Sequence, residues 1–151
     1  IVVDRVAKSL APFVTTVEVG ERQLLKNRDL QHIYHPIGGA RRPGVSFLEA
    51  AAALHPTPAL GGEPRAEALA WLRDHEAGRG MYGGPVGWLS LREDRGELVV
   101  GLRSGVFTTD TGRLYAGCGI VAASQAASER AETRLKFQPM LRGISDQWTL
   151  K

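Results

Sequence analysis

The fold is decided between residues 86 and 121, where the sequence reads VGWLSLREDRGELVVGLRSGVFTTDTGRLYAGCGIV. Three segments of this stretch are rich in β-branched, aromatic and other apolar residues, and they predict strands over residues 86–91, 97–107 and 113–121. The two connectors between them carry the Asp and Gly residues that are typical of hairpin turns. Because strands joined by such turns run antiparallel, the stretch predicts an antiparallel meander.

Upstream of the meander, the strongest signals are helical. Residues 2–10 place apolar side chains at helical spacing, and Pro12 ends that pattern. Ser46 followed by Glu49 three residues later is a capping box, which predicts a helix over residues 47–54. A further helix is predicted over residues 65–75, because the preceding proline suits the first turn of a helix.

Shorter elements connect these helices. Alternating β-formers predict strands over residues 15–20 and 29–37. Residues 38–44 are predicted to form a loop. Three prolines and two glycines between residues 55 and 64 predict a shaped loop without regular structure.

A last helix is predicted from Ser124, acting as N-cap, to about Arg142. Its expected inner face is apolar and consists of Ala127, Ala131, Leu135 and Met140. Helices followed by an antiparallel meander indicate an α+β fold, a sheet with flanking helices. No internal repeat, linker or low-complexity tract divides residues 1–151, so we predict a single domain.

Length and composition are those of a folded domain. The chain has 151 residues, 43% of them hydrophobic and 23% charged, with 19 Lys and Arg against 16 Asp and Glu. No apolar run approaches the ~20 residues that a membrane span requires, and the basic residues are too scattered for a nucleic-acid surface. The single cysteine, Cys118, suits a reducing cytoplasm and is interpreted as a buried, inert thiol. Because the chain opens with Ile1 and not with methionine, we interpret it as part of a longer protein.

Three charged residues share one face of the last predicted helix. Glu129, Glu132 and Lys136 are spaced i, i+3 and i+7. Two carboxylates one turn apart suit a hard cation such as Mg²⁺, which keeps several waters and needs few protein ligands. Spacing alone nevertheless favours a solvated helix face with a Glu132–Lys136 ion pair.

Arg103 and two glycines stand out in the predicted strands. Arg103 interrupts a strand that is otherwise apolar, where a guanidinium needs a partner, either a substrate carboxylate or an internal Asp or Glu. Gly117 and Gly119 indicate either the close approach of a backbone or ligand, or close packing of a helix. The four histidines match no metal-site template, so no zinc site is predicted.

Several segments together resemble the chorismate-utilising enzymes, and among these the isochorismate synthases. They are LHPTPALGGEP (54–64), RGMYGGPVGW (79–88), GELVVGLRS (96–104), LYAGCGIV (114–121) and the helix 124–136 with its E-x-x-E-x-x-x-K pattern. With LQHIY (30–34) and the opening helix, the resemblance covers essentially the whole chain in family order. It implies the C-terminal part of the anthranilate synthase component I-like fold, which binds chorismate and Mg²⁺ in a cleft.

The resemblance implies an activity and a metal site. Isochorismate synthases are isomerases that add water at C2 of chorismate and expel the C4 hydroxyl, with Mg²⁺ as cofactor. By resemblance, Glu132 is a Mg²⁺ ligand and Glu129 acts on metal-bound water. Lys136 is expected beside the metal and the substrate carboxylate.

Substrate contacts are implied in the same way. Arg103 and Tyr82 are expected to grip the enolpyruvyl carboxylate of chorismate. The backbone around Gly117 and Gly119 is expected to accept the ring carboxylate. His32 is expected to face the substrate ring.

Ala59 discriminates best between the branches of the family. Members that use water carry a small apolar residue at this point of the H-P-T-P-A motif, whereas members that use ammonia generally have threonine. Ala59 therefore implies a nucleophile pocket shaped for water. Residues 117–119 and KFQPML (136–141) resemble the menaquinone branch. A salicylate synthase, a siderophore-type isochorismate synthase and a non-catalytic chorismate-binding fragment are the alternatives.

Part of the family's machinery is expected upstream of this chain. The lysine that activates water, the general-acid glutamate and the other Mg²⁺-binding glutamate all precede the matching region in the family, so the isolated chain is expected to be inactive. Family sheets combine strands of both halves, so this half alone is expected to expose sheet edges and apolar surface. Dimerisation or strand exchange between copies is the hypothesis that follows.

Overall fold

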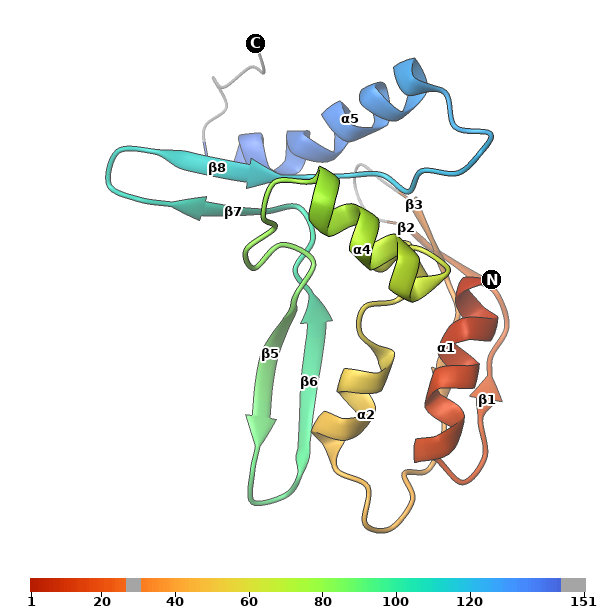
Figure 1. Ribbon diagram of the computed structural model, residues 1–151. Helices are drawn as coiled ribbons and strands as arrows, with labels where there is room; N and C mark the ends of the chain where they lie inside the picture. Colours follow the sequence, from red (N-terminus) through yellow and green to blue (C-terminus); the bar gives the residue numbers. More distant parts are fainter. Residues whose placement is uncertain (27–30, 145–151) are drawn as a thin grey trace. The chain divides into compact units, whose positions relative to one another are not determined.

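The computed structural model describes residues 1–26 and 31–144, which form helices and antiparallel hairpins (Figure 1). The chain divides into two compact units. Unit 1 comprises Ile1–His75 and Gly87–Leu98, and unit 2 comprises Glu76–Val86 and Val99–Lys151. The α+β class predicted from the sequence is confirmed.

The main helices of unit 1 have the bounds that the sequence predicts. They are α1 (Val2–Leu10), α2 (Phe47–Leu54) and α4 (Arg65–His75), with the 3-10 turn η1 (Ala11–Phe13) after α1. Helix α1 packs against α2. Each prediction rested on a local signal, either a cap, a proline or apolar spacing, and local signals act in the same way in the folded chain.

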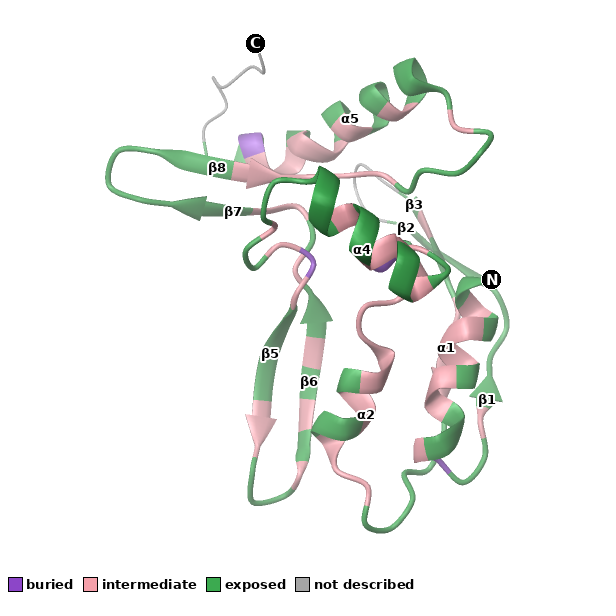
Figure 2. Ribbon diagram, viewed as in Figure 1, coloured by how far each residue is buried: buried purple, intermediate pink, exposed green. Residues whose placement is uncertain are grey.

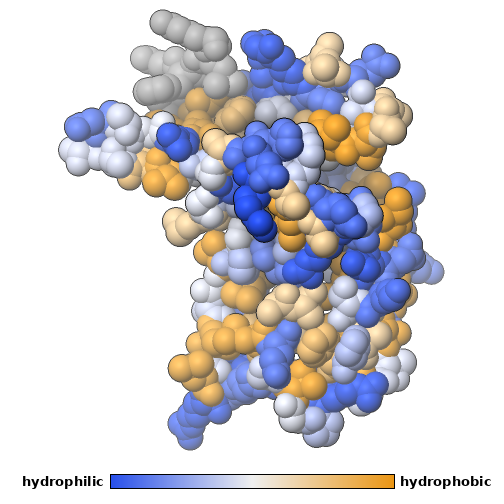
Figure 3. Space-filling view, viewed as in Figure 1, coloured by the Kyte–Doolittle hydropathy of each residue, from blue (hydrophilic) through white to orange (hydrophobic). Residues whose placement is uncertain are grey.

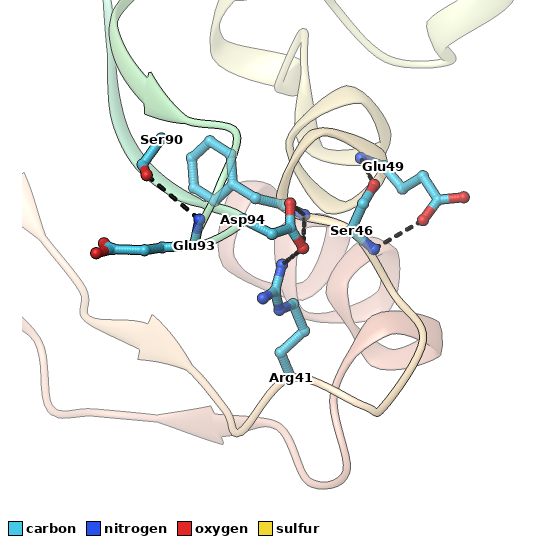
Figure 4. A network of polar contacts seen from close by, with 7 residues as sticks. Arg41, Ser46, Glu49, Ser90, Glu93 and Asp94 are labelled. Carbon is cyan, nitrogen blue, oxygen red and sulfur yellow. Dashed lines mark hydrogen bonds and ion pairs between the residues drawn. The ribbon is translucent and has the colours of Figure 1, made fainter.

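Two sets of hydrogen bonds hold the start of α2, one within the helix and one from Asp94 (Figure 4). The Ser46 hydroxyl accepts from the Glu49 N–H at 3.1 Å, and the Glu49 carboxylate accepts from the Ser46 N–H at 2.8 Å. Asp94, on the turn of a hairpin, also accepts from the Phe47 N–H at 3.1 Å and pairs with Arg41 at 2.5 Å. The capping box is confirmed, and Asp94 ties the hairpin turn to the helix N-terminus, where a carboxylate is favoured.

The segment 55–64 contains a turn of helix, so the prediction of a loop without regular structure is wrong there. Helix α3 (Pro58–Gly61) begins with a proline, whose fixed φ suits the first helical position. The Thr57 carbonyl accepts from the N–H groups of Leu60 and Gly61, both at 2.9 Å. Gly62 ends the turn with φ of 79°, a conformation that favours glycine.

The strands of unit 1 form small antiparallel pairs. Strand β1 (Glu18–Val19) pairs with β4 (Ile37–Gly38), and β2 (Gln23–Lys26) pairs with β3 (Gln31–Tyr34). The predicted strand over 29–37 is confirmed at β3, while Asp29 and Leu30 lie outside the described residues. Strand β2 was not predicted, because its QLLK sequence does not alternate, and it is identified only by its pairing with β3.

The predicted meander is divided into two hairpins. Strand β5 (Pro85–Ser90) pairs with β6 (Arg95–Val100), and β7 (Ser104–Phe107) pairs with β8 (Gly112–Tyr115). Hairpin β5–β6 contributes residues to both units. The single strand predicted over 97–107 breaks between β6 and β7, where Arg103 has φ of 49°. A non-glycine residue in the left-handed region cannot continue an extended strand.

Helix α5 (Ala126–Ile144) turns an unexpected face toward the rest of unit 2 (Figure 2). Ala127, Ala131 and Leu135, predicted to lie inside, are exposed, and only Met140 is half-buried. Ser124 precedes the helix and accepts from the Val121 N–H at 3.1 Å, so it is not the predicted N-cap. The half-buried side of the helix includes polar residues, which the hydrophobic pattern could not indicate.

Few side chains are fully buried. Among the described residues, the buried apolar side chains are Val14 in unit 1 and Leu141 in unit 2, which are 5% and 4% exposed. Large apolar side chains lie open on both hairpins and on strands β2 and β3, and Figure 3 shows such patches on the drawn face. The expected exposure of apolar surface is therefore confirmed. None of the helices within residues 1–26 and 31–144 combines the length and hydrophobicity that a membrane crossing requires.

Candidate functional site

The candidate site of unit 2 is built where the segment after β8 meets α5. Residues 116–121 were predicted to continue the strand, but β8 ends at Tyr115 and these residues form an irregular segment, here called the glycine loop. The loop lies against the helix through Lys136, whose ammonium donates to the Gly117 carbonyl at 2.9 Å. The glycines therefore lie in a loop and not in a strand interior, which corrects the sequence prediction.

The two glycines of the loop have different surroundings. A side chain at Gly117 would meet the hydroxyl of Tyr82 at 3.1 Å, so only glycine fits there without a shift. Gly119 has open space around it. The close neighbour of Gly117 is a tyrosine side chain, and the sequence had indicated a backbone, a ligand or a packed helix.

Tyr82 stands beside the loop in a fixed orientation. Its ring stacks on that of Tyr115, the last residue of β8, with centroids 5.5 Å apart and planes 15° apart. Its position is also tied through the backbone, because the Tyr82 N–H donates to the Arg79 carbonyl at 2.9 Å. Stacked rings of this kind hold a phenol in one direction, which places the Tyr82 hydroxyl at Gly117.

The glycine loop offers backbone donors. Within the described part of the chain, the N–H groups of Gly117, Cys118 and Gly119 donate to no protein acceptor. Successive free N–H groups are the usual means by which a backbone binds an anion. The N–H groups of the loop are therefore available as hydrogen-bond donors.

On α5, Lys136 connects the loop to a carboxylate. Its ammonium lies 2.6 Å from Oε1 of Glu132, one turn away, in addition to its bond to Gly117. The Glu132 side chain is 54% exposed and that of Lys136 is 21% exposed. The ion pair predicted from the spacing is confirmed, and it is part of the loop contact, not of a solvated face alone.

Glu129 lies on the same helix and is held in its ionised form. Hydrogen bonds from the Ser124 hydroxyl, and secondly from the Cys118 thiol, lower the pKa of its carboxyl below the ordinary 4.5. The positive charge of Lys136 acts in the same direction. These contacts favour the ionised form of Glu129, which is the form that a cation binds.

The donor set fits a magnesium ion with few protein ligands. Residues 1–26 and 31–144 contain no group of three or more His, Cys, Asp or Glu side chains that could hold a metal ion. Glu129 and Glu132 supply two carboxylates, and Mg²⁺ is commonly bound by one or two carboxylates together with waters and substrate oxygens. A softer metal, which prefers Cys and His ligands, would not be served by this pair.

Arg103 belongs to the same unit but not to a strand. It lies between β6 and β7, directly before Ser104, with its backbone in the left-handed region. Within the turn that precedes it, the Leu102 N–H donates to the Val100 carbonyl at 2.8 Å. The prediction that Arg103 lies inside a strand is therefore wrong, because β6 ends at Val100 and β7 begins at Ser104.

The two remaining predicted site residues lie in unit 1. His32 is half-buried in β3 and pairs across the hairpin with Leu25 of β2. Ala59 lies in the single turn of α3 with its side chain exposed. Both positions are defined by local structure, β3 by its hairpin partner and α3 by its proline.

Sequence reasoning missed three residues of the unit 2 site. Thr133 drew no attention, although its hydroxyl donates to the Cys118 sulfur at 3.4 Å. Cys118 was interpreted as inert, and it is half-buried with its thiol facing the Glu129 carbonyl oxygen at 3.8 Å. Tyr115 was assigned only to a strand. Thr133 could have been found from the spacing, because it lies four residues after Glu129 and therefore on the same face of the helix.

Comparison with known proteins identifies the family and the relatives to which the chain is similar. Residues 1–145 match the family described as chorismate binding enzyme. The chain is 42% identical over 125 residues to the isochorismate synthase MenF of Bacillus subtilis, covering 82% of the chain and 26% of that relative. It is 40% identical over 147 residues to the salicylate biosynthesis isochorismate synthase of Pseudomonas aeruginosa, covering 96% of the chain and 31% of that relative.

The fold is shared with a solved structure as well. The menaquinone-specific isochorismate synthase MenF from Escherichia coli superposes with a TM-score of 0.84 at 32% identity, over 92% of this chain and 32% of that one. The chain thus spans between 26% and 32% of the length of these three relatives.

Proposed function

The chain belongs to the chorismate binding enzyme family, and on that premise we propose that it carries the anion-binding and metal-binding part of an isochorismate synthase. The reaction is the isomerisation of chorismate to isochorismate, with water added at C2 and the C4 hydroxyl expelled. The single observation that carries the proposal is the glycine loop, whose N–H groups at residues 117–119 donate to no acceptor among the described residues and whose Gly117 carbonyl is bound by Lys136. The similarity to relatives named as isochorismate synthases supports the same activity.

In this proposal, unit 2 recognises the carboxylates of chorismate. The backbone N–H groups around Gly117 and Gly119, which have no acceptor among the described residues, donate to the ring carboxylate. Tyr82 and Arg103 hold the enolpyruvyl carboxylate, for which a guanidinium offers a two-pronged donor. Lys136 supplies a positive charge next to the loop, which favours the approach of a carboxylate when a cation has replaced it as the partner of Glu132.

The proposed cofactor is Mg²⁺, held by Glu132 directly and by Glu129 through water. When bound, the ion neutralises and orients a substrate carboxylate. Within the chain, hydrogen bonds from Ser124 and Cys118 lower the pKa of the Glu129 carboxyl. Lys136 balances the charge of Glu132 until a cation is present.

His32 and Ala59 are two further proposed substrate-facing positions, and both rest on the resemblance to the family. A small apolar side chain at residue 59 leaves room for a water molecule as nucleophile, which supports hydration over amination. Proton transfer needs a general base and a general acid, and we propose that both come from sequence outside this chain. The 151-residue chain alone is therefore expected to bind but not to convert chorismate.

The proposal also covers the metabolic pathway and the cellular location of the protein. We assign the protein to the menaquinone branch, which residues 117–119 and 136–141 support, with a cytoplasmic location supported by the single cysteine. A siderophore or salicylate role is the second candidate, and the similarity to the Pseudomonas aeruginosa protein favours it.

The test is identification of the product of chorismate with Mg²⁺, by chromatography coupled to mass spectrometry, in the complete protein that carries this chain. Isochorismate has the mass of chorismate and is recognised by its separate elution. Salicylate with pyruvate would instead identify a salicylate synthase, and anthranilate formed with ammonia would exclude hydration altogether.

Two variants sharpen this test. Ala59→Thr is expected to lower isochorismate formation, because the larger side chain narrows the proposed water pocket. Ala66→Thr, at an exposed position of α4, is the matched control and is expected to leave the product and its rate unchanged. Equal rates for both variants would count against the role of residue 59.

A further inference from the structure

Three successive turns of α5 form hydrogen bonds with the glycine loop. The Glu129 carbonyl accepts from the Cys118 thiol at 3.8 Å, and the Thr133 hydroxyl donates to the Cys118 sulfur at 3.4 Å. One turn further along, Lys136 donates to the Gly117 carbonyl at 2.9 Å. The loop is thus fastened to the helix at Cys118 and at Gly117.

Cys118 is the one side chain that can fasten the middle of the loop. Gly117 and Gly119 on either side have none, and glycine backbones have the largest conformational freedom to lose on ordering. The N–H groups of residues 117–119 donate to no acceptor among the described residues, so hydrogen bonds of their own do not hold them in place. Their direction therefore depends on the contacts of the thiol between them and on the bond from Lys136 to the Gly117 carbonyl.

A thiol suits this position because it donates and accepts at once. It is a weak donor and a weak acceptor, and here it gives its proton toward Glu129 and receives one from Thr133. Cys118 is half-buried against α5. In the proposed site, Thr133 binds neither the metal nor the substrate. It can therefore affect the ligand only through Cys118.

We propose that Thr133 and Cys118 are positioning residues, which hold the backbone N–H groups of the glycine loop in the direction needed for the ring carboxylate of chorismate. The proposal rests on the proposed function for the identity of the ligand. The anchoring of the loop, in contrast, is a property of the protein without ligand. The two parts can therefore be measured separately.

The test uses Thr133→Val, which keeps the shape and branching of the side chain and removes only the hydroxyl. Backbone ¹⁵N relaxation is measured at Gly117 and Gly119 in the ligand-free protein. Order parameters are expected to fall from about 0.85 toward the flexible range below about 0.6. The dissociation constant for chorismate with Mg²⁺, measured by calorimetry, is expected to rise about three- to tenfold, the loss typical of one net hydrogen bond.

Two further variants make the test specific. Thr133→Ser retains the hydroxyl and is expected to restore both the order parameters and the affinity. Ser128→Ala, at an exposed position of the same helix, is expected to change neither. A loss of thermal stability without recovery by serine would indicate a packing role for Thr133 and would overturn the proposal.

Each remaining outcome is also decisive. Unchanged order parameters in Thr133→Val would overturn the anchoring role. Lower order parameters with unchanged chorismate affinity would show that the loop is anchored but does not orient a ligand, which overturns the positioning role. Absence of chorismate binding by the unmodified protein would refute the proposed function itself, and the relaxation data would still report on the anchor.

Discussion

Lys136 and Glu132 form an ion pair within α5, with Nζ 2.6 Å from Oε1. The same ammonium donates to the Gly117 carbonyl at 2.9 Å, so one cation joins the proposed metal ligand to the glycine loop. Exposed pairs at this spacing contribute only about 0.3–0.5 kcal/mol to stability. The pair is therefore more important for arranging the site than for holding the fold.

Replacing Lys136 is expected to weaken chorismate binding. Lys136→Met removes the charge beside the loop and frees the Gly117 carbonyl, and a hydrogen bond to a charged group contributes about 1.5–3 kcal/mol, or roughly 10- to 100-fold in affinity. Arg134→Met, which removes a charge from an exposed position of α5, is the control and is expected to change affinity by less than about threefold. Calorimetric titration with chorismate distinguishes them, and equal losses in both variants would indicate only a general charge effect.

Replacing Glu132 is expected to act on the metal. Glu132→Gln should raise the Mg²⁺ concentration needed for half-maximal chorismate binding by about 10- to 100-fold, and Glu129→Gln should have a smaller effect because it is proposed to act through water. Glu67→Gln, an exposed position on α4, is the control. The measurement is chorismate affinity as a function of Mg²⁺ concentration. Identical Mg²⁺ curves for Glu132→Gln and the control would remove Glu132 from the metal site.

The backbone conformation of Arg103 makes it possible to remove its side chain and keep the turn. Its φ of 49° is a conformation that glycine adopts readily, so Arg103→Gly removes the guanidinium without forcing the turn between β6 and β7 to change. Chorismate affinity is expected to fall at least tenfold while the circular dichroism spectrum stays the same. Arg113→Gly, which removes an exposed guanidinium from β8, is the comparison. Retained affinity in Arg103→Gly would exclude the carboxylate role.

The capping box of α2 predicts a pH dependence of stability. The backbone N–H of Ser46, and secondly its hydroxyl, lower the pKa of Glu49 below 4.5 in the folded chain. The unfolded chain therefore takes up this proton first as pH falls, so the stabilisation is present above pH 4.5 and is lost as pH falls through the folded-state pKa. The difference in Tm between the protein and Glu49→Gln should close over that range, and a difference that persists below it would contradict the assignment.

The contribution of the Ser46 side chain to the stability of α2 can be measured separately, from the Tm at neutral pH. Ser46→Ala is expected to cost about 1 kcal/mol, or roughly 2–4 °C in Tm for a chain of this size. Ser128→Ala is the matched control, because Ser128 is exposed within α5 and caps nothing.

The open apolar surface of unit 1 predicts self-association of the isolated chain. Leu24 and Ile33 face each other across the β2–β3 pair and are 51% and 61% exposed. A second copy is the occupant we expect, because a two-stranded sheet leaves strand edges open for pairing. Light scattering should give a mass above that of the monomer that rises with concentration, and Leu24→Lys with Ile33→Lys should reduce it. A strictly monomeric species would contradict this expectation.

The elements that could be predicted are those whose signals are local. The bounds of α1, α2 and α4 follow from a proline, a capping box and apolar spacing within each segment. The hairpin turns follow from Asp and Gly in short connectors. The family resemblance also required only the order of residues, and the match over residues 1–145 bears it out.

The elements that could not be predicted depend on distant partners. Strand β2 exists through its pairing with β3, and the break at Arg103 divides a run that is apolar throughout. The apolar pattern of α5 predicted the wrong inner face, because Leu135 is exposed while Thr133 and Lys136 turn toward the glycine loop.

The sequence by itself determined α1, α2 and α4, the antiparallel class and the family, because caps, turns and motifs are properties of neighbouring residues. It also supplied Glu129, Glu132 and Lys136 as candidates through their spacing. Only the tertiary structure decided that Lys136 reaches the Gly117 carbonyl and that Cys118 is held by Thr133. Those contacts join residues 15 and 19 positions apart in the chain, and the hydrogen bonds that select them form only when the loop and the helix are folded together.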